Sequence, residues 1–201
     1  MENEIDLKLK EFQEAYCPSA KIALEFSEVE TNKGEASVSF EGWKTGYFLI
    51  TIYPSYYSRT YEQKNFILQH ELTHIQDVVN PQFGFDYGYL CTYGLGESDK
   101  TRPLEQVISN FIWDVTIDIR LEKKYLHKVY SFEQRINLDV KSYLKDAWNG
   151  VDIDLPLKNI EALLDGDSIT LAGIKQLTEK VAVEIKRLSN EKEDPSLRGL
   201  R

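Results

Sequence analysis

The sequence of 201 residues predicts an α+β fold, in which a small, mostly antiparallel sheet is followed by a run of helices. Two observations carry this prediction. Between Ile22 and Tyr53, apolar residues either alternate with other residues or include many aromatic and β-branched types, as they do in strands. Before and after that region, apolar residues recur at the spacing of a helix. We expect a first domain over residues 1–127 and a helical C-terminal subdomain, packed on it, over residues 128–201.

The N-terminal part predicts one helix and three strands. An apolar stripe with helical spacing covers residues 4–16 and ends at Cys17-Pro18, because proline lacks the amide that a helix interior needs. Strands are predicted where apolar residues alternate, or where aromatic and β-branched residues are dense, and turn residues separate them. These strand regions are 22–26, 38–40 and 47–53.

Helical spacing returns after the strands. Residues 61–79 predict a helix that Asn80-Pro81 stops. The apolar residues of the segment 103–125 fit a helical stripe. From Phe111 to Leu121 they also alternate with polar neighbours as in a strand, so periodicity alone leaves helix and strand open. Pro103 suits a first helical turn and favours the helix. Further helices are predicted around residues 131–148, 156–165 and 168–190.

Between the two long predicted helices, residues 82–96 are rich in glycine and in aromatic residues. A loop of this length inside a compact domain is usually functional. Its rings could equally pack over the core without a further role. The sequence leaves both interpretations open.

The composition argues against several classes of partner. The net charge is −9, and lysine and arginine form no run, which argues against binding to nucleic acid or to an anionic membrane. The acidic N-terminus does not resemble a secretory signal, and no apolar stretch approaches the roughly 18 residues that span a bilayer. Two cysteines do not form a disulfide framework and favour a reducing compartment, so we expect a cytoplasmic protein.

The segment His70-Glu71-Leu72-Thr73-His74 carries the strongest chemical signal. On a helix, His70 and His74 lie one turn apart on the same face, so both imidazoles can reach one metal ion. Glu71 lies close enough to polarise a metal-bound water. The alternative is a surface helix with two coincidental histidines. Catalytic zinc usually takes three protein ligands and leaves a fourth position for water, so this segment lacks one ligand.

Carboxylates and His127 are the candidates for the third ligand. The longer HExxHxxGxxH motif is excluded, because Asp77 and Asn80 stand at the two positions that would complete it. Asp114 and Asp118 lie four residues apart in a largely apolar segment, where an ionised carboxylate is costly without compensation. A bound zinc would explain one aspartate, and a hydrogen bond to a ligating imidazole would explain the other. The alternative places both on the solvated edge of an amphipathic element.

Over roughly residues 20–125, the chain resembles the gluzincin branch of zinc metallopeptidases, the thermolysin-like clan and its minimal single-domain relatives. Residues 70–74 match the active-helix segment of that family at every position. The resemblance implies a zincin-like fold whose third ligand lies on a downstream helix, four residues before an Asp that orients a ligating histidine. Asp114 and Asp118 have that spacing, although the family has Glu at the ligand position. The alternatives for this ligand are Glu105, Asp118 and Glu122.

On this resemblance, we expect a zinc-dependent metallopeptidase that acts on a peptide or protein substrate. His70, His74 and Asp114 would bind Zn²⁺, and Glu71 would activate the zinc-bound water as the catalytic base. The resemblance also implies that residues 47–53 lie along the cleft and pair with an extended peptide. The residue that stabilises the oxyanion is open among Tyr87, Tyr89, Tyr93, Arg120 and His127.

Two other functions are compatible with the sequence. A catalytically weak or latent zincin-like domain could bind metal and serve as an interaction or regulatory module, with the helical C-terminus as its contact surface. A different zinc hydrolase could act on a non-peptide amide, although the strand-like edge at residues 47–53 argues mildly against this. The oligomeric state is unknown from the sequence.

Overall fold

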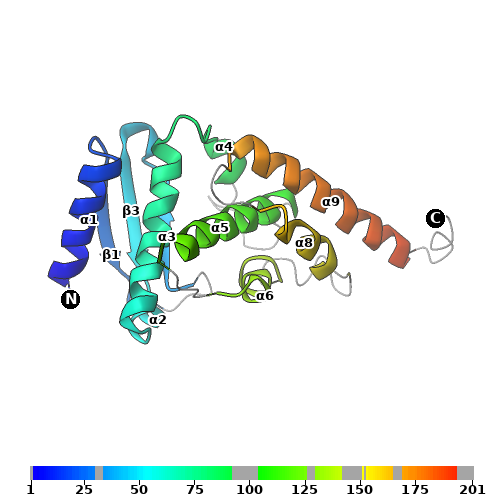
Figure 1. Ribbon diagram of the computed structural model, residues 1–201, viewed down its shortest axis with the longest axis horizontal. Helices are drawn as coiled ribbons and strands as arrows, with labels where there is room; N and C mark the ends of the chain where they lie inside the picture. The colour runs from blue at the N-terminus through cyan, green and yellow to red at the C-terminus, as the bar shows by residue number, and fades with distance from the viewer. Residues whose placement is uncertain are drawn as a thin grey trace. The chain divides into compact units, whose positions relative to one another are not determined.

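Figure 1 shows the computed structural model of the chain. Its described residues are 2–29, 34–91, 104–125, 130–141, 151, 153–164 and 169–193. The fold is α+β and mostly helical, with one three-stranded sheet in the described part, which confirms the predicted class. The chain forms two compact units, which combine residues 1–87 with 121–129 and residues 88–120 with 130–201. The division into domains at residue 127 stays a prediction.

The sheet of the first unit has the strand order β1-β3-β2. The three strands are β1 (Lys21–Phe26), β2 (Ala36–Ser39) and β3 (Tyr47–Ile52). The central strand β3 pairs parallel with β1 and antiparallel with β2, so the sheet is mixed and not mostly antiparallel as predicted. The physical reason is the route of the chain, which passes from β1 to the far side of β3 before it turns back into β3.

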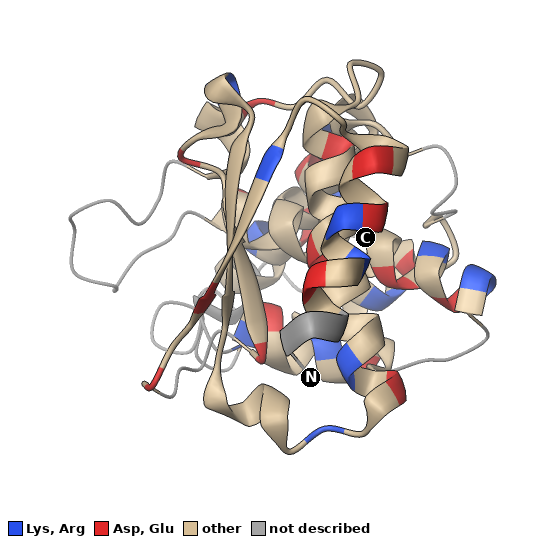
Figure 2. Ribbon diagram, turned by 90° about the vertical axis from the view of Figure 1, so that its left-hand side faces the viewer, with Lys and Arg blue, Asp and Glu red and all other residues tan. Residues whose placement is uncertain are grey.

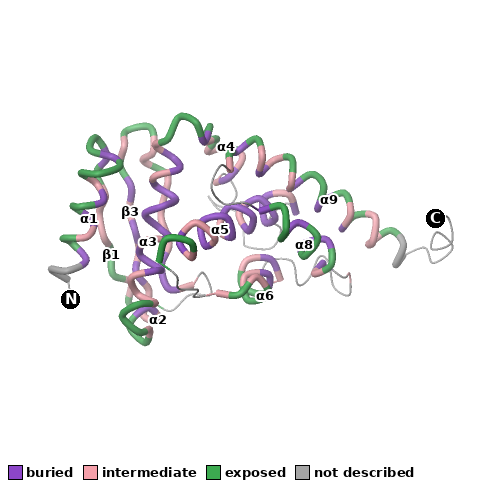
Figure 3. Tube along the Cα trace, in the orientation of Figure 1, coloured by how far each residue is buried: buried purple, intermediate pink, exposed green. Residues whose placement is uncertain are grey.

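The central position of β3 also corrects an expectation about the substrate. Because β1 and β2 already take up the backbone groups on its two edges, β3 cannot pair with an extended peptide. The expectation that residues 47–53 serve as the substrate-pairing strand is therefore wrong. Along β3, Phe48, Ile50 and Ile52 are fully buried and alternate with more exposed residues, so one face of the sheet is covered (Figure 3).

Helices α1 (Glu2–Tyr16) and α3 (Tyr61–Val79) belong to the same unit. Lys8 of α1 donates a hydrogen bond of 2.9 Å to Asn65 of α3, so the two helices are neighbours. The predicted apolar stripe of α1 is buried at Ile5, Leu9 and Phe12, while its charged residues gather on the exposed side (Figure 2). Short helical segments connect the main elements: η1 (Trp43–Thr45) precedes β3, and α2 (Pro54–Tyr57) follows it.

Helix α3 has the bounds that the sequence predicts, because both of its ends carry clear signals. At the start, the Thr60 hydroxyl accepts a hydrogen bond from the backbone N–H of Gln63, and the Gln63 side chain accepts one from the backbone N–H of Thr60. At the end, Pro81 disfavours helical backbone at Asn80, which is extended in the structure. The histidine-bearing segment therefore lies in the middle of a capped helix of 19 residues.

The ambiguous segment at residues 103–125 is the helix α5 (Leu104–Tyr125), which confirms the favoured interpretation. Apolar residues cover most of its circumference, and most of them are buried (Figure 3). A helix that is buried on most sides carries apolar residues outside its stripe as well, which explains why strand-like alternation was also present in its sequence. The predicted loop at residues 82–96 contains the short helix α4 (Tyr87–Leu90), and residues 92–96 lie outside the described residues.

The remaining helices of the second unit follow α5 in the chain. They are α6 (Phe132–Arg135), the π-helical segment η2 (Ile136–Lys141), α8 (Asp154–Glu161) and α9 (Leu171–Glu193). The three predicted C-terminal helices are thus present at these places, while residues 142–148, 165 and 168 lie outside the described part. Part of the apolar core of this unit consists of side chains from these helices that are almost fully buried: Ile136, Val140, Leu157, Ile174 and Ile185.

Two cysteines lie within the described residues. Cys17 and Cys91 are both free thiols. Burial raises the pKa of the Cys17 thiol, which keeps it protonated and poorly nucleophilic. No helix in the described ranges has the length and apolar character that crossing a membrane requires.

Candidate metal centre

The two histidines of α3 face each other. His70 and His74 are 5% and 6% exposed, and their Nε2 atoms lie 3.1 Å apart. Their ring centroids are 4.8 Å apart, with an angle of 75° between the ring planes. This arrangement follows from the helix, which brings side chains four residues apart onto one face. The predicted pairing of the two imidazoles is therefore present.

The separation of the two nitrogens fits a shared transition metal. Zinc binds imidazole nitrogen at about 2.0–2.1 Å, so tetrahedral coordination separates two such nitrogens by about 3.3 Å. The observed 3.1 Å differs from this by only a small side-chain movement. The pair can therefore close on one ion without a change in the backbone of α3.

Asp114 completes a group of three possible ligands. One ligand atom from each of His70, His74 and Asp114 lies within 4.8 Å of the others, and the described residues contain no second group of this kind. The structure thus has a possible metal-binding site made of the three residues that the sequence singled out. Two nitrogens and one carboxylate oxygen form a donor set that suits Zn²⁺ and also other divalent transition metals.

Glu71 accompanies the histidine pair on α3. It follows His70 directly and is only 8% exposed. Successive residues of an α-helix point about 100° apart, so Glu71 lies beside the histidine face rather than on it. Glu71 is not a member of the group of possible ligands, and its role as a catalytic base stays a prediction.

An aromatic cluster borders His74 within the first unit. The Phe40 ring packs edge-on against the His74 ring with centroids 6.2 Å apart, and it also contacts Phe85 at 5.6 Å. Trp43 extends the cluster, with its ring centroid 5.3 Å from that of Phe85. Apolar rings next to an imidazole lower the local dielectric and strengthen its interaction with a cation. In the sequence, Phe40 indicated only a strand.

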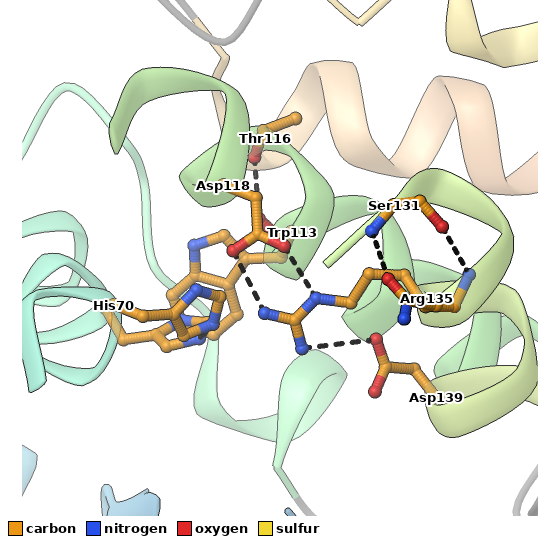
Figure 4. A network of polar contacts seen from close by, with 9 residues as sticks. His70, Trp113, Thr116, Asp118, Ser131, Arg135 and Asp139 are labelled. Carbon is orange, nitrogen blue, oxygen red and sulfur yellow. Dashed lines mark hydrogen bonds and ion pairs between the residues drawn. The ribbon is translucent and has the colours of Figure 1, made fainter. Parts of the chain in front are cut away.

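Asp118 has a partner that the sequence analysis missed. Arg135 donates two hydrogen bonds to its carboxylate, of 2.6 Å from Nε and 3.0 Å from Nη2 (Figure 4). Burial alone would lower the pKa of Arg135, but the charges of Asp118 and Asp139 raise this pKa well above its ordinary value. The cation that a buried aspartate requires is thus supplied here by the chain. The sequence signal that could have revealed the pair was this requirement, together with an arginine in the helix predicted around residues 131–148.

The other predicted carboxylates do not join the metal-binding group. Glu105 forms an ion pair with Lys186, and the hydrogen bond from Lys186 lowers the pKa of Glu105. Among the described residues, neither Glu105 nor Asp118 nor Glu122 belongs to a group of three possible ligands.

The expected oxyanion donor stays a prediction. Tyr93 and His127 lie outside the described residues. Tyr89 packs its ring under the ammonium group of Lys175, with 4.4 Å between Nζ and the ring centroid. The remaining candidates are Tyr87 and Arg120, of which Arg120 is half-buried on α5.

Comparisons of the chain with protein-family models, with curated proteins and with solved structures returned no match. The resemblance to gluzincins is therefore one of motif and spacing. The possible metal site itself depends on the places that the side chains of His70, His74 and Asp114 take in the structure.

Proposed function

We propose that the protein is a zinc-dependent metallopeptidase with a zincin-like arrangement of its metal ligands. The observation that carries this proposal is the buried histidine pair, whose Nε2 atoms lie 3.1 Å apart and group with a carboxylate oxygen of Asp114. The adjacent buried Glu71 supports it, because a hydrolase of this kind needs a carboxylate beside the ion and not only ligands on it.

The charges of the ligands suit a hydrolytic role. His70 and His74 would bind as neutral imidazoles, and Asp114 would bring one negative charge. A divalent cation held in this way keeps a net positive charge. When bound, zinc lowers the pKa of a coordinated water and polarises the substrate carbonyl.

Glu71 would move the proton. In the proposed reaction, the oxygen of a water forms a bond to the carbonyl carbon, and the bond from that carbon to the amide nitrogen breaks. The Glu71 carboxylate accepts a proton from the attacking water and donates it to the leaving amine, so the residue ends in its starting state. The products are a carboxylic acid and an amine, and transfer of the remaining water proton turns them into a carboxylate and an ammonium group at neutral pH.

The aromatic cluster beside His74 favours a peptide with apolar side chains over a small polar amide. Phe40, Trp43 and Phe85 are only half-buried, so part of their ring surface is accessible next to the metal ligands. An apolar side chain of a substrate gains free energy when it covers such surface. A protein or peptide supplies these side chains at regular intervals on both sides of an amide.

The decisive variant is Glu71→Gln, which keeps the size of the side chain and removes its basicity. We expect zinc content and thermal stability near those of the wild type, while cleavage of unstructured peptides falls by about 10²- to 10⁴-fold. Glu62→Gln is the matched control, because Glu62 is an exposed residue in the first turn of the same helix. Undiminished cleavage by Glu71→Gln protein would show that the proposed mechanism is wrong.

The same assay separates the proposal from its alternative. A wild-type protein that binds zinc in a one-to-one ratio but cleaves no unstructured peptide would favour the metal-binding interaction or regulatory module. A protein without bound transition metal, whose behaviour is unchanged by chelators, would remove both.

A further inference from the structure

Arg135 lies 17 residues beyond Asp118 in the chain and binds it through two parallel hydrogen bonds. We propose that Arg135 is a positioning residue for the metal centre: by holding Asp118, it fixes the face of α5 that presents Asp114. This inference rests on the proposed function, since it assigns a role toward the ligand Asp114. It gives the segment after residue 130 a part in the site, which the motif and its resemblance do not.

The ion pair has the geometry of a specific contact. The Nε and Nη2 atoms of Arg135 each reach a different oxygen of the Asp118 carboxylate, at 2.6 Å and 3.0 Å (Figure 4). Such a two-bond arrangement fixes the carboxylate in direction as well as in distance, which a single bond does not. Lysine cannot reproduce it, because its ammonium group is a point charge without a planar pair of donors.

The ion pair is buried, and a second carboxylate and an aromatic ring also contact its guanidinium. The side chains of Arg135 and Asp118 are 11% and 10% exposed. Asp139 lies on the other side of the guanidinium, with its carboxylate 3.5 Å from Nη1. The Arg135 guanidinium also packs on the Tyr130 ring, with Cζ 4.5 Å from the ring centroid. Without Arg135, two carboxylates would face each other in a partly dry place, and both would move or take up protons.

The short helix that carries Arg135 has further contacts of its own. It begins with a capping box, in which the Ser131 and Gln134 side chains bond each other's backbone N–H groups. Phe132 packs its ring edge-on against Phe111 of α5, with centroids 5.3 Å apart. The helix that carries Arg135 therefore contacts α5 at two places, through the Phe132 ring and through the ion pair with Asp118.

The ion pair between Arg135 and Asp118 lies one helical turn from the proposed ligand Asp114. Asp114 and Asp118 lie four residues apart on α5 and therefore share one face of the helix. Aspartate is one methylene shorter than the glutamate of the gluzincin pattern, so its carboxylate reaches less far from the backbone. A ligand with a short reach tolerates little rotation or shift of its helix, and partners behind metal ligands commonly have this orienting role.

The test measures metal binding in the full-length chain. We expect Arg135→Met to weaken Zn²⁺ affinity by about 10-fold in a chelator competition, the low end of the effect of losing a direct partner of a ligand, because Arg135 acts on Asp114 only through Asp118 and α5. Arg135→Lys should fall between this variant and the wild type, because it restores the charge and not the two-bond geometry. With Co²⁺ in place of Zn²⁺, the visible absorption bands should shift in Arg135→Met, since they report the coordination geometry. Wild-type affinity and bands in this variant would overturn the proposal.

Arg187→Met is the matched control. Arg187 also binds a carboxylate through two nitrogens, but its partner Glu184 lies on the same helix α9 and both side chains are more than one-third exposed. The same substitution at this site should leave Zn²⁺ affinity and the Co²⁺ bands unchanged. An equal loss in both variants would show that the effect is not specific to Arg135.

A double variant separates positioning from mere stability. Asp118→Asn combined with Arg135→Met removes both buried charges, so the protein should regain thermal stability that Arg135→Met alone loses. If Arg135 positions the site, Zn²⁺ affinity stays low in the stable double variant, and the Co²⁺ bands stay shifted. Recovery of affinity together with stability would assign the pair a structural role only.

Failure of this inference can be told from failure of the proposed function. If His74→Ala binds Zn²⁺ as well as the wild type, the metal site is wrong and the role of Arg135 falls with it. If His74→Ala abolishes binding while Arg135→Met has no effect, the metal site stands and the positioning role does not.

Discussion

At the candidate metal centre, two side chains from one helix turn and one from another helix offer their donor atoms within a span of 4.8 Å. The two imidazoles are placed by helical geometry alone, since any pair four residues apart shares a face. Asp114 is different, because its approach depends on where α5 lies and on a short side chain. The histidines should therefore dominate metal affinity, while Asp114 tunes it and neutralises half of the charge of the ion.

Single substitutions at the ligands should give graded losses of metal. We expect the purified wild type to hold zinc in a one-to-one ratio, His74→Ala to lose it, and Asp114→Ala to bind it more weakly than the wild type. Metal content by mass spectrometry and competition with a chelator measure these effects. Asp6→Ala, at an exposed position of α1, is the control. If Asp114→Ala retains wild-type affinity, Asp114 is not the third ligand.

At the scale of elements, the sequence predicted what local signals encode. The bounds of α3 followed from Thr60 and Pro81, whose effects reach only a few residues along the chain. The direction of the strands did not, because alternation is the same in parallel and antiparallel pairs and the route from β1 through β2 to β3 is a property of the whole sheet. The contact between Asp118 and Arg135 was also missed, since it joins two helices that periodicity treats separately.

The N-terminal cap of α3 should contribute measurably to stability. Thr60→Ala removes the hydroxyl that accepts the backbone N–H of Gln63, and we expect the free energy of unfolding to fall by about 1 kcal/mol. Urea unfolding monitored by circular dichroism measures this change. Thr60→Ser keeps the hydroxyl and should stay near the wild type. Equal losses in the two variants would mean that the methyl group matters and the cap does not.

The contact between α5 and α9 should depend on pH. The hydrogen bond from Lys186 lowers the pKa of Glu105, so the stability that this pair contributes is present above the ordinary glutamate pKa and is lost as pH falls through the lowered value. The Lys186→Gln variant should therefore melt below the wild type at neutral pH, with the difference vanishing in acid. Because both side chains are largely exposed, the effect should be at most about 1 kcal/mol.

Thermal unfolding over a range of acidic to neutral pH follows this difference. Lys180→Gln provides the control, because Lys180 is an exposed residue on the same helix. A difference between Lys186→Gln and the wild type that stays constant down to strongly acidic pH would contradict the assignment to Glu105.

At the scale of the whole molecule, the two compact units are interleaved in sequence. The second unit combines residues 88–120 with residues 130–201, so most of α5 belongs with the helices that follow it. A boundary near residue 127 was predicted from the sequence, because nothing beyond it resembles the metallopeptidase pattern. A resemblance in one stretch of chain does not reveal which segments share a core, since that depends on contacts between distant residues.

A chain that ends at Lys128 should therefore be unstable and should show no gain in activity. It lacks buried side chains such as Ile136, Leu157 and Ile174. Burial of each such residue contributes about 1.5–3 kcal/mol, and their combined loss approaches a typical total stability of about 5–15 kcal/mol. Circular dichroism, urea unfolding and peptide cleavage test this expectation. A stable, cooperatively folding fragment of residues 1–128 with higher activity would instead support an autonomous domain that the C-terminal helices inhibit.

The strand order β1-β3-β2 also bears on how the protein is made. During synthesis, β1 and β2 emerge first, yet neither is the neighbour of the other. Neither can pair in the sheet before β3 has been made, and β3 is followed by the short helix α2 and then by the histidine helix α3. One continuous piece of chain, residues 47–79, thus contains both the central strand of the sheet and the two imidazoles. The central strand and the two imidazoles therefore leave the ribosome close together, whereas Asp114 on α5 follows only later in the chain.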